Sequence, residues 1–537
     1  MLWNNVSLAA AFSLREYIDL TGRHEWAETQ AMLAREGESL DFRTIAPEPI
    51  PDDQNFCAIP ALKNILLVPE NADPNSPQGR QLQRLMDTAL PDGTKDNPGT
   101  SFAKLTEPGA LQKILNQAIK DMQSGKYIPR PSGSQGATLG KPADMAAWAA
   151  WLRREGSPPI PPDSGNPAHD VLAWLSRDDA LVNELAPGLE RPGAQWTPAL
   201  KTLNLPEPFL KISLPHQSAV KVFMYTLCLR AIAAARAGDA LDARQSLLIA
   251  LRLNQANMED PFFISALISC GESMVASNAV WELCDAHSGG AEDFRVLQDA
   301  LSQLDYQKSF LYSLRGEVVY VNNTSEYMKK TRDIRILNPF DRPGPVEGVI
   351  DSLVLHLVPD GMFDANTAAV AGWYLDYYIK PLREGGFREF LCKQRELQSL
   401  VYKLKSQHPY THLDEMVALI AMPSTSSIVD KVVYAQCLVN EAIAACALER
   451  YRIEHGTYPD SLGDANHAGE KPIPMDAVSG KPMGYRKTAN GKYALWCVGL
   501  TGVDGGGRRV LDKTRPASTN FSDPNYRGDW VWDFPAN

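Results

Sequence analysis

Two histidines and two acids lie close together in the segment His408-Pro-Tyr-Thr-His412, which is followed by Asp414 and Glu415. Imidazole and carboxylate groups are common ligands of zinc, so this composition could form a metal site. A zinc-binding helix, however, places both histidines on one face, and Pro409 disfavours α geometry at His408. We therefore interpret the segment as a loop that leads into a helix and carries ordinary histidines.

The spacing Ser-x-x-Lys, which can activate a serine nucleophile, occurs at Ser101/Lys104 and at Ser218/Lys221. Two matches are close to what chance gives in a chain of this composition, and the accompanying Lys-Thr-Gly sequence is absent. The sequence also contains no Gly-x-Ser-x-Gly, Gly-x-Gly-x-x-Gly or phosphate-binding loop motif. We therefore expect no catalysis by a nucleophilic serine or cysteine.

Acidic side chains could instead form the carboxylate pair of a glycosidase, which requires a fixed separation between its two members. Sequence alone does not place two carboxylates at such a distance. The candidates are Asp178 with Asp179, Glu207, and Asp360 with Asp364.

Trp148, Trp151 and Trp174 could stack on sugars or bases. Their helical spacing favours positions in a hydrophobic core.

The chain contains 8 cysteines and no Cys-x-x-Cys pair. Cys437 and Cys446 are predicted to lie about 180° apart on one helix, and Cys270 and Cys284 roughly 21 Å apart along another. We therefore interpret the cysteines as buried free thiols.

The formal net charge is −11, from 53 basic and 64 acidic side chains. No basic run stands out against this balance, so the sequence opposes nucleic-acid binding. The partner expected for such a chain is an unidentified protein or small ligand.

No stretch has the 18 or so consecutive apolar residues of a membrane helix. The N-terminal apolar run, residues 7–14, is short, and no basic residue precedes it. We expect no membrane span in this chain. Either the protein is cytoplasmic, or an anchor or leader stood upstream of it.

Helical periodicity and loop-forming residues divide the chain into four parts. We predict an N-terminal helical segment over 1–50, an irregular region of short helices and loops over 51–200, and a helical bundle over 201–425. Single helices are predicted within these parts at 14–37, 261–286 and 291–315, and a helical hairpin is predicted around Gly238.

The last part, 426–537, is predicted to be a small α+β domain with one long helix and an antiparallel sheet. Ser427 and Asp430 have capping-box spacing at a helix start, and Gly456 marks its end. Asn490-Gly491 predicts a β-hairpin, and the sequence DWVWDF, residues 529–534, predicts a final strand. The fold class is therefore α+β, predominantly α.

The sequence ALERYRIEHGTYPDSL, residues 447–462, resembles the end of the helix of type II secretion major pseudopilins. IPMDAVSGKPMGYRKTANGKYALWCVGLTGVDGGG then resembles their hairpin and glycine-rich loop, and RGDW their closing strand. The resemblance covers about one fifth of the chain. It implies a pseudopilin-like domain, although the hydrophobic first half of the pseudopilin helix is absent.

Pseudopilins of this family hold calcium in the glycine-rich loop. By position, Asp504 and Asp529 match the two acids of that motif. The resemblance thus implies calcium as the cofactor, bound by Asp504 and Asp529 together with backbone carbonyl groups. The alternative is a surface loop without an ion.

Near the N-terminus, HEWAETQAMLAREGESLDFRTIAPEPIPDDQNF resembles the start of a large group of uncharacterised bacterial envelope proteins, which a membrane helix normally precedes. That resemblance implies an exported, periplasmic or envelope location. We therefore predict a non-enzymatic, envelope-associated binding or structural protein. The alternative is a hydrolase of glycans or peptides with a carboxylate-based site in the helical body.

Overall fold

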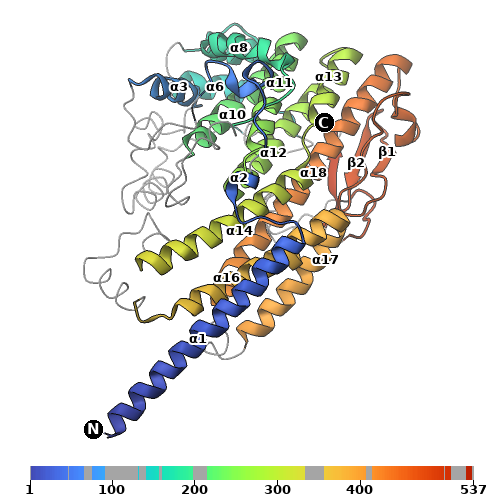
Figure 1. Ribbon diagram of the computed structural model, residues 1–537. Helices are drawn as coiled ribbons and strands as arrows, with labels where there is room; N and C mark the ends of the chain where they lie inside the picture. The colour runs from blue at the N-terminus through green and yellow to red at the C-terminus, as the bar shows by residue number, and fades with distance from the viewer. Residues whose placement is uncertain are drawn as a thin grey trace.

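Among the residues that the structure describes, the protein is mainly helical, with a small sheet near the C-terminus (Figure 1). This arrangement confirms the predicted α+β, predominantly α fold class. The structure is a computed structural model, and it describes residues 2–45, 47–63, 65, 75–90, 131, 141–155, 160–196, 214–332, 356–406, 414–500, 502–508 and 528–534.

The first helix, α1, spans Leu2–Arg35 and so begins twelve residues before the predicted start at Leu14. It ends as predicted at Gly37, whose φ of 77° is accessible to glycine at little cost. Figure 1 shows the N-terminal end of α1 projecting away from the other helices, while its C-terminal half packs against α16 (Asp360–Tyr374).

A layer of short elements follows α1 in the sequence. The segment around Asn55 pairs with the segment around Gly193, which lies far from it in the sequence. The Phe56 amide there donates to the Gly193 carbonyl at 2.8 Å. The described elements are α2 (Phe42–Ile45), η1 (Asp52–Gln54), η2 (Phe56–Ala58), α3 (Pro77–Met86), α6 (Met145–Glu155), α7 (Pro167–Leu175), η4 (Ser176–Asp178), α8 (Asp179–Leu185) and η5 (Ala186–Glu190).

The helical bundle begins with the predicted hairpin, α10 (Pro215–Ala237) and α11 (Ala240–Met258), which turns at Gly238 with φ 85°. One prediction here is wrong, because residues 291–315 form two helices rather than one. The Asp305 side chain accepts from the Lys308 amide at 2.9 Å and so starts a new helix. The other helices are α12 (Phe263–Asp285), α13 (Ala291–Leu301), α14 (Tyr306–Thr331), α16, the π-helical turn η8 (Leu375–Ile379) and α17 (Lys380–Lys405).

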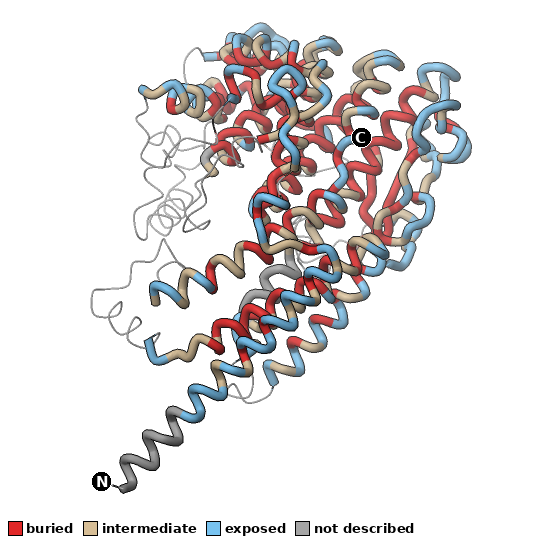
Figure 2. Tube along the Cα trace, viewed as in Figure 1, coloured by how far each residue is buried: buried red, intermediate tan, exposed pale blue. Residues whose placement is uncertain are grey.

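The longest helix, α18, spans Met416–His455 and runs through the middle of the molecule (Figures 1 and 2). The capping-box prediction at Ser427 is wrong, because the helix is already formed at Met416 and Ser427 lies inside it. The predicted domain boundary at residue 426 therefore falls within α18. Its end at Gly456, with φ 76°, is as predicted. Helices α12, α13, α14, α16 and α17 all contact α18.

The sheet contains β1 (Gly484–Lys487), β2 (Tyr493–Cys497) and β3 (Trp530–Asp533) in the order β1-β2-β3, with both pairs antiparallel. The predicted hairpin turns at Gly491, where φ is 76°. The short helix η10 (Leu462–Ala465) lies between α18 and the sheet in sequence. The sheet contacts the bundle as well as α18, since the Trp281 indole of α12 donates to the Asp533 carbonyl at 2.9 Å.

Within the described part of the chain, three helical segments are long and apolar enough to cross a membrane when judged by length and composition alone: His216–Ala237, Phe263–Asp285 and Ile428–His455. Most of each segment is buried inside the protein. Packing against neighbouring helices is sufficient to explain their apolar character. The absence of a membrane span therefore stays a prediction.

Candidate functional site

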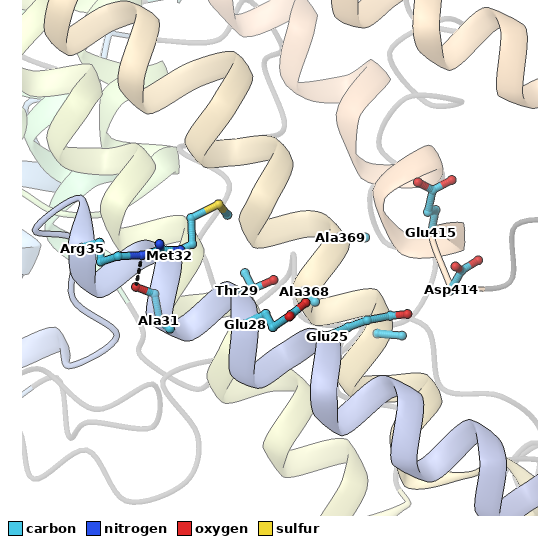
Figure 3. Close-up of a pocket in the computed structure, with 11 residues that line it drawn as sticks. Glu25, Glu28, Thr29, Ala31, Met32, Arg35, Ala368, Ala369, Asp414 and Glu415 are labelled. Carbon is cyan, nitrogen blue, oxygen red and sulfur yellow. Dashed lines mark hydrogen bonds between the residues drawn. The ribbon is translucent and has the colours of Figure 1, made fainter.

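An open hollow of about 910 Å³ lies between α1, α16 and the start of α18 (Figure 3). Its size is typical of ligand-binding clefts. Acidic side chains of α1 and of the residues just before α18 line it together with small residues of α16. The lining residues are Glu25, Glu28, Thr29, Ala31, Met32, Arg35, Ala365, Ala368, Ala369, Asp414 and Glu415.

Helical spacing brings these residues together. On α1, Glu25, Glu28 and Met32 lie at positions i, i+3 and i+7, which share one helical face. On α16, Ala365 and Ala368 lie at i and i+3, and their short side chains leave the space that the hollow occupies. The sequence analysis did not use either of these helix faces to predict a function. The one sequence signal that could have found the hollow was the Glu25/Glu28 spacing.

Negative charge gathers in the hollow, where four of the described lining residues are acidic. Burial, followed by repulsion from Asp414 and then Glu28, raises the pKa of Glu25. Figure 3 shows Arg35 at the end of the hollow away from Asp414 and Glu415, where its guanidinium donates to the Ala31 carbonyl at 3.3 Å. The arrangement therefore favours a cationic group between the acids of α1 and those that precede α18.

Three of the acids predicted for a glycosidase pair, Asp179, Asp360 and Asp364, are used in ion pairs. The Asp179 carboxylate pairs with Arg230, and the Asp360 carboxylate pairs with Arg332. The Asp364 carboxylate accepts from the Lys329 ammonium at 2.6 Å. Arg230 lies on α10, and Lys329 and Arg332 lie in α14 and at its C-terminal end, so the acids connect elements of the fold.

Asp178, beside Asp179, is buried, and burial raises its pKa to about 6. Glu207 lies outside the described residues.

The other chemical motifs have ordinary surroundings where the structure describes them. The Lys221 side chain is exposed on α10 and lies 5.7 Å from the Tyr225 ring centroid. Trp148, Trp151 and Trp174 are buried, as their core interpretation requires. Ser101, Lys104, His408 and His412 lie outside the described residues.

A serine, a histidine and an aspartate that the sequence gave no reason to connect meet in the bundle core. The Asp260 carboxylate contacts His216 Nε2 at 3.0 Å and accepts from the Ser265 hydroxyl at 3.3 Å. In a nucleophilic triad the histidine stands between the serine and the acid. Here the aspartate stands between them, and all three residues are buried. The geometry is that of a buried polar contact between helices.

The structure brings the two acids of the predicted calcium loop to the same glycine-rich turn. The Asp504 carboxylate accepts from the Trp496 indole at 2.9 Å and from the Gly506 amide at 2.8 Å. These donors, the amide first, lower the pKa of Asp504. The Asp529 carboxylate is buried and accepts from the Gly505 amide at 3.0 Å and the Gly507 amide at 2.8 Å.

These contacts show which groups of the turn surround the two carboxylates. Amide N–H groups point at both carboxylates, so negative charge is already stabilised by hydrogen bonds. A calcium ion would instead need carbonyl oxygens pointing inward beside the carboxylates. The middle of the loop, 509–527, lies outside the described residues, and calcium binding stays a prediction.

Comparison of the chain with protein-family models, with curated proteins and with solved structures found no match.

Proposed function

We propose that the protein is a non-enzymatic, envelope-associated binding protein and that the hollow between α1 and α16 is its binding surface. The observation that carries this proposal is the excess of carboxylates in an open hollow. Glu25, Glu28, Asp414 and Glu415 line it, and Arg35 is the one basic residue among the lining residues that the structure describes. Such a surface attracts a positively charged ligand or protein segment.

The projecting end of α1 adds an apolar component to this surface. Leu14, Tyr17 and Leu20 are 59%, 65% and 64% exposed. Large apolar side chains exposed near a charged hollow are typical of protein-binding sites. A partner with a basic segment and an adjoining apolar face fits both features.

A cationic probe tests the proposal. We expect a tetralysine peptide to bind the full chain, with affinity that falls as salt is raised. The double variant Glu25→Gln with Asp414→Asn should weaken that binding by about tenfold, because it removes two charges that face the ligand.

The matched control is Glu292→Gln with Asp299→Asn on α13. It changes the net charge equally, at two exposed acids that pair with Arg295. The affinity of this control variant for the tetralysine peptide should stay within about twofold of the affinity of the native chain. Equal losses in the two double variants, or no binding by the native chain, would reject the hollow as a cation-binding surface.

We further propose that the C-terminal helix and sheet form a pseudopilin-like unit and that the protein acts outside the cytoplasm. The order of helix, hairpin, glycine-rich turn and closing strand supports the first point. The second rests on the sequence resemblance. Fractionation of cells that make the protein naturally, with an antibody against the full chain, would locate it. Recovery with the cytoplasmic fraction alone would contradict an envelope location.

The second candidate function is a carboxylate-based hydrolase of glycans or peptides. The observation that favours it is the position of Glu25 beside Asp414 in the open hollow, where burial raises the pKa of Glu25, as a general acid requires. If this function is correct, the chain should hydrolyse a glycan or peptide substrate and Glu25→Gln should abolish turnover, while Glu292→Gln should not. Turnover that is unchanged in Glu25→Gln would exclude this site.

A further inference from the structure

Two cysteines that are distant in sequence meet in the core between α18 and the sheet. Cys437 lies on α18 and Cys497 ends β2, and both are buried. Their sulfurs and a carboxylate oxygen of Asp476 all lie within 4.8 Å of one another. The sequence interpretation compared Cys437 only with Cys446 on the same helix, so it missed this pair.

Two buried carboxylates hold the backbone at the end of β2. Glu441, one turn after Cys437 on α18, accepts from the Cys497 backbone amide at 3.0 Å. Asp476 accepts from the adjacent Val498 amide at 2.9 Å. The end of β2 is therefore held against one particular turn of α18, with Cys497 facing Cys437.

The arrangement does not favour a metal ion. A structural zinc site normally has four ligands, most of them thiolate or imidazole. The Asp476 carboxylate already accepts from the Val478 amide at 2.8 Å and from the Ser479 hydroxyl at 2.9 Å, besides the Val498 amide. Its oxygens are thus occupied by donors, and the thiols of Cys437 and Cys497 contact each other through a side-chain hydrogen bond.

We infer that Cys437 and Cys497 are a disulfide-forming pair that links β2 covalently to α18. The two sulfurs lie within 4.8 Å of each other, and rotation about the side-chain bonds is the movement that brings such thiols together. The bond would close a loop of about sixty residues, and a cross-link of that length restricts the unfolded chain strongly. This inference is independent of the hollow and of its ligand.

The chemistry is thiol–disulfide exchange with a disulfide oxidant. The sulfurs of Cys437 and Cys497 join, and the two thiols lose two protons and two electrons. The disulfide of the oxidant takes up these two protons and two electrons, so its S–S bond breaks and it becomes two thiols. Burial raises the pKa of both cysteines, so neither thiol reacts readily in the folded protein. The bond must therefore form before β2 closes over α18, in a compartment that supplies the oxidant.

Thiol counting on the full chain tests the pair. The protein is made in bacterial cells with a reducing cytoplasm and in cells with an oxidising one, then denatured and alkylated. All 8 cysteines should react in the first sample, and 8 − 2 = 6 in the second. The oxidised sample should also melt several degrees higher, and reduction after denaturation should restore all the thiols.

Peptide mapping identifies the bond. Cleavage after Lys and Arg places Cys437 and Cys446 in the peptide 432–450 and Cys497 in the peptide 493–508. The Cys446→Ser variant should still yield the linked peptides, and Cys437→Ala should not. A full thiol count in the oxidised native chain, or a bond through Cys446, would overturn the proposal. Zinc bound stoichiometrically to the reduced protein, and lost in Cys437→Ala, would overturn it in favour of a metal site.

Discussion

Gly22 of α1 and Gly361 of α16 lie directly against each other, with no side chain between the two backbones. A Cβ atom at Gly22 would overlap the Gly361 carbonyl oxygen, and one at Gly361 would overlap the backbone of Ile18. The Gly361 amide also donates to the Asp19 carboxylate at 2.7 Å. This crossing fixes α1 on α16 and therefore sets the width of the acidic hollow.

Replacing Gly22 by alanine should separate the two helices. The added methyl group overlaps backbone atoms, which cannot rotate away, so we expect a loss of about 1–3 kcal/mol in the free energy of unfolding. Limited proteolysis should cut α1 faster in the variant, and binding at the hollow should weaken with it.

Gly372→Ala is the matched control on α16. A Cβ atom there would lie 3.9 Å from the Met32 terminal methyl group, an ordinary contact. Because alanine favours a helix over glycine, the change should be neutral or stabilise the protein by up to about 1 kcal/mol. Equal destabilisation by the two variants would contradict a specific contact at Gly22.

Glu272 makes the stability of the bundle depend on pH. It is buried on α12 and accepts from the Asn257 side-chain amide at 3.0 Å. Burial is the main cause that raises its pKa from 4.5 to about 7. The folded state therefore holds its proton more tightly than the unfolded state. The resulting stabilisation is complete below pH 4.5 and is lost as the pH rises through 7.

The variant Glu272→Gln should remove this dependence, because a neutral amide can still accept from Asn257. The stability of the native chain relative to the variant should fall by on the order of 2–3 kcal/mol between pH 4 and pH 8. Denaturant unfolding at both pH values measures the difference. A constant difference across that range would show that Glu272 has the same pKa in both states.

Asp529 should be more important for stability than Asp504. One oxygen of its buried carboxylate accepts from the Gly505 amide and the other from the Gly507 amide. An asparagine side chain has only one oxygen, so it cannot make both hydrogen bonds in the same way. Asp529→Asn should therefore cost about 1–3 kcal/mol and speed hydrogen exchange at these two amides. Asp504 is exposed, and Asp504→Asn should cost less than about 1 kcal/mol. The reverse order would contradict the described hydrogen bonding of the turn.

Calcium binding at the same turn has a separate readout. Free calcium at ten times its dissociation constant would add about 1.4 kcal/mol to the free energy of unfolding. The full chain should then melt higher in millimolar calcium than in chelator, and Asp504→Ala should remove the difference. Identical melting curves for the native chain in calcium and in chelator would contradict calcium binding at this turn.

Local sequence signals predicted the ends of elements well where glycine decides the backbone. Gly37, Gly238, Gly456 and Gly491 all have positive φ at predicted stops or turns. The start of α18 was mispredicted, because a capping box is also compatible with a helix interior when tertiary packing continues the helix. The break at residues 302–305 was missed because both flanking helices have the same apolar period.

The sites were less predictable, since each depends on residues that are distant in sequence. The acids before α18 meet Glu25 only because α1 packs on α16, and Cys437 meets Cys497 only because the sheet packs on α18. No local pattern encodes either approach. The acids of the glycine-rich turn could be found from sequence because a resemblance supplied their order.

The central position of α18 also affects how the protein can be made. Helices α12, α13, α14, α16 and α17 pack against it, yet all of them precede it in the chain. During synthesis these helices are released first and carry apolar faces whose partner has not yet been translated. The bundle therefore cannot complete its fold until residues 416–455 have left the ribosome. A chain that stops before α18 would leave those faces open to aggregation or to chaperones.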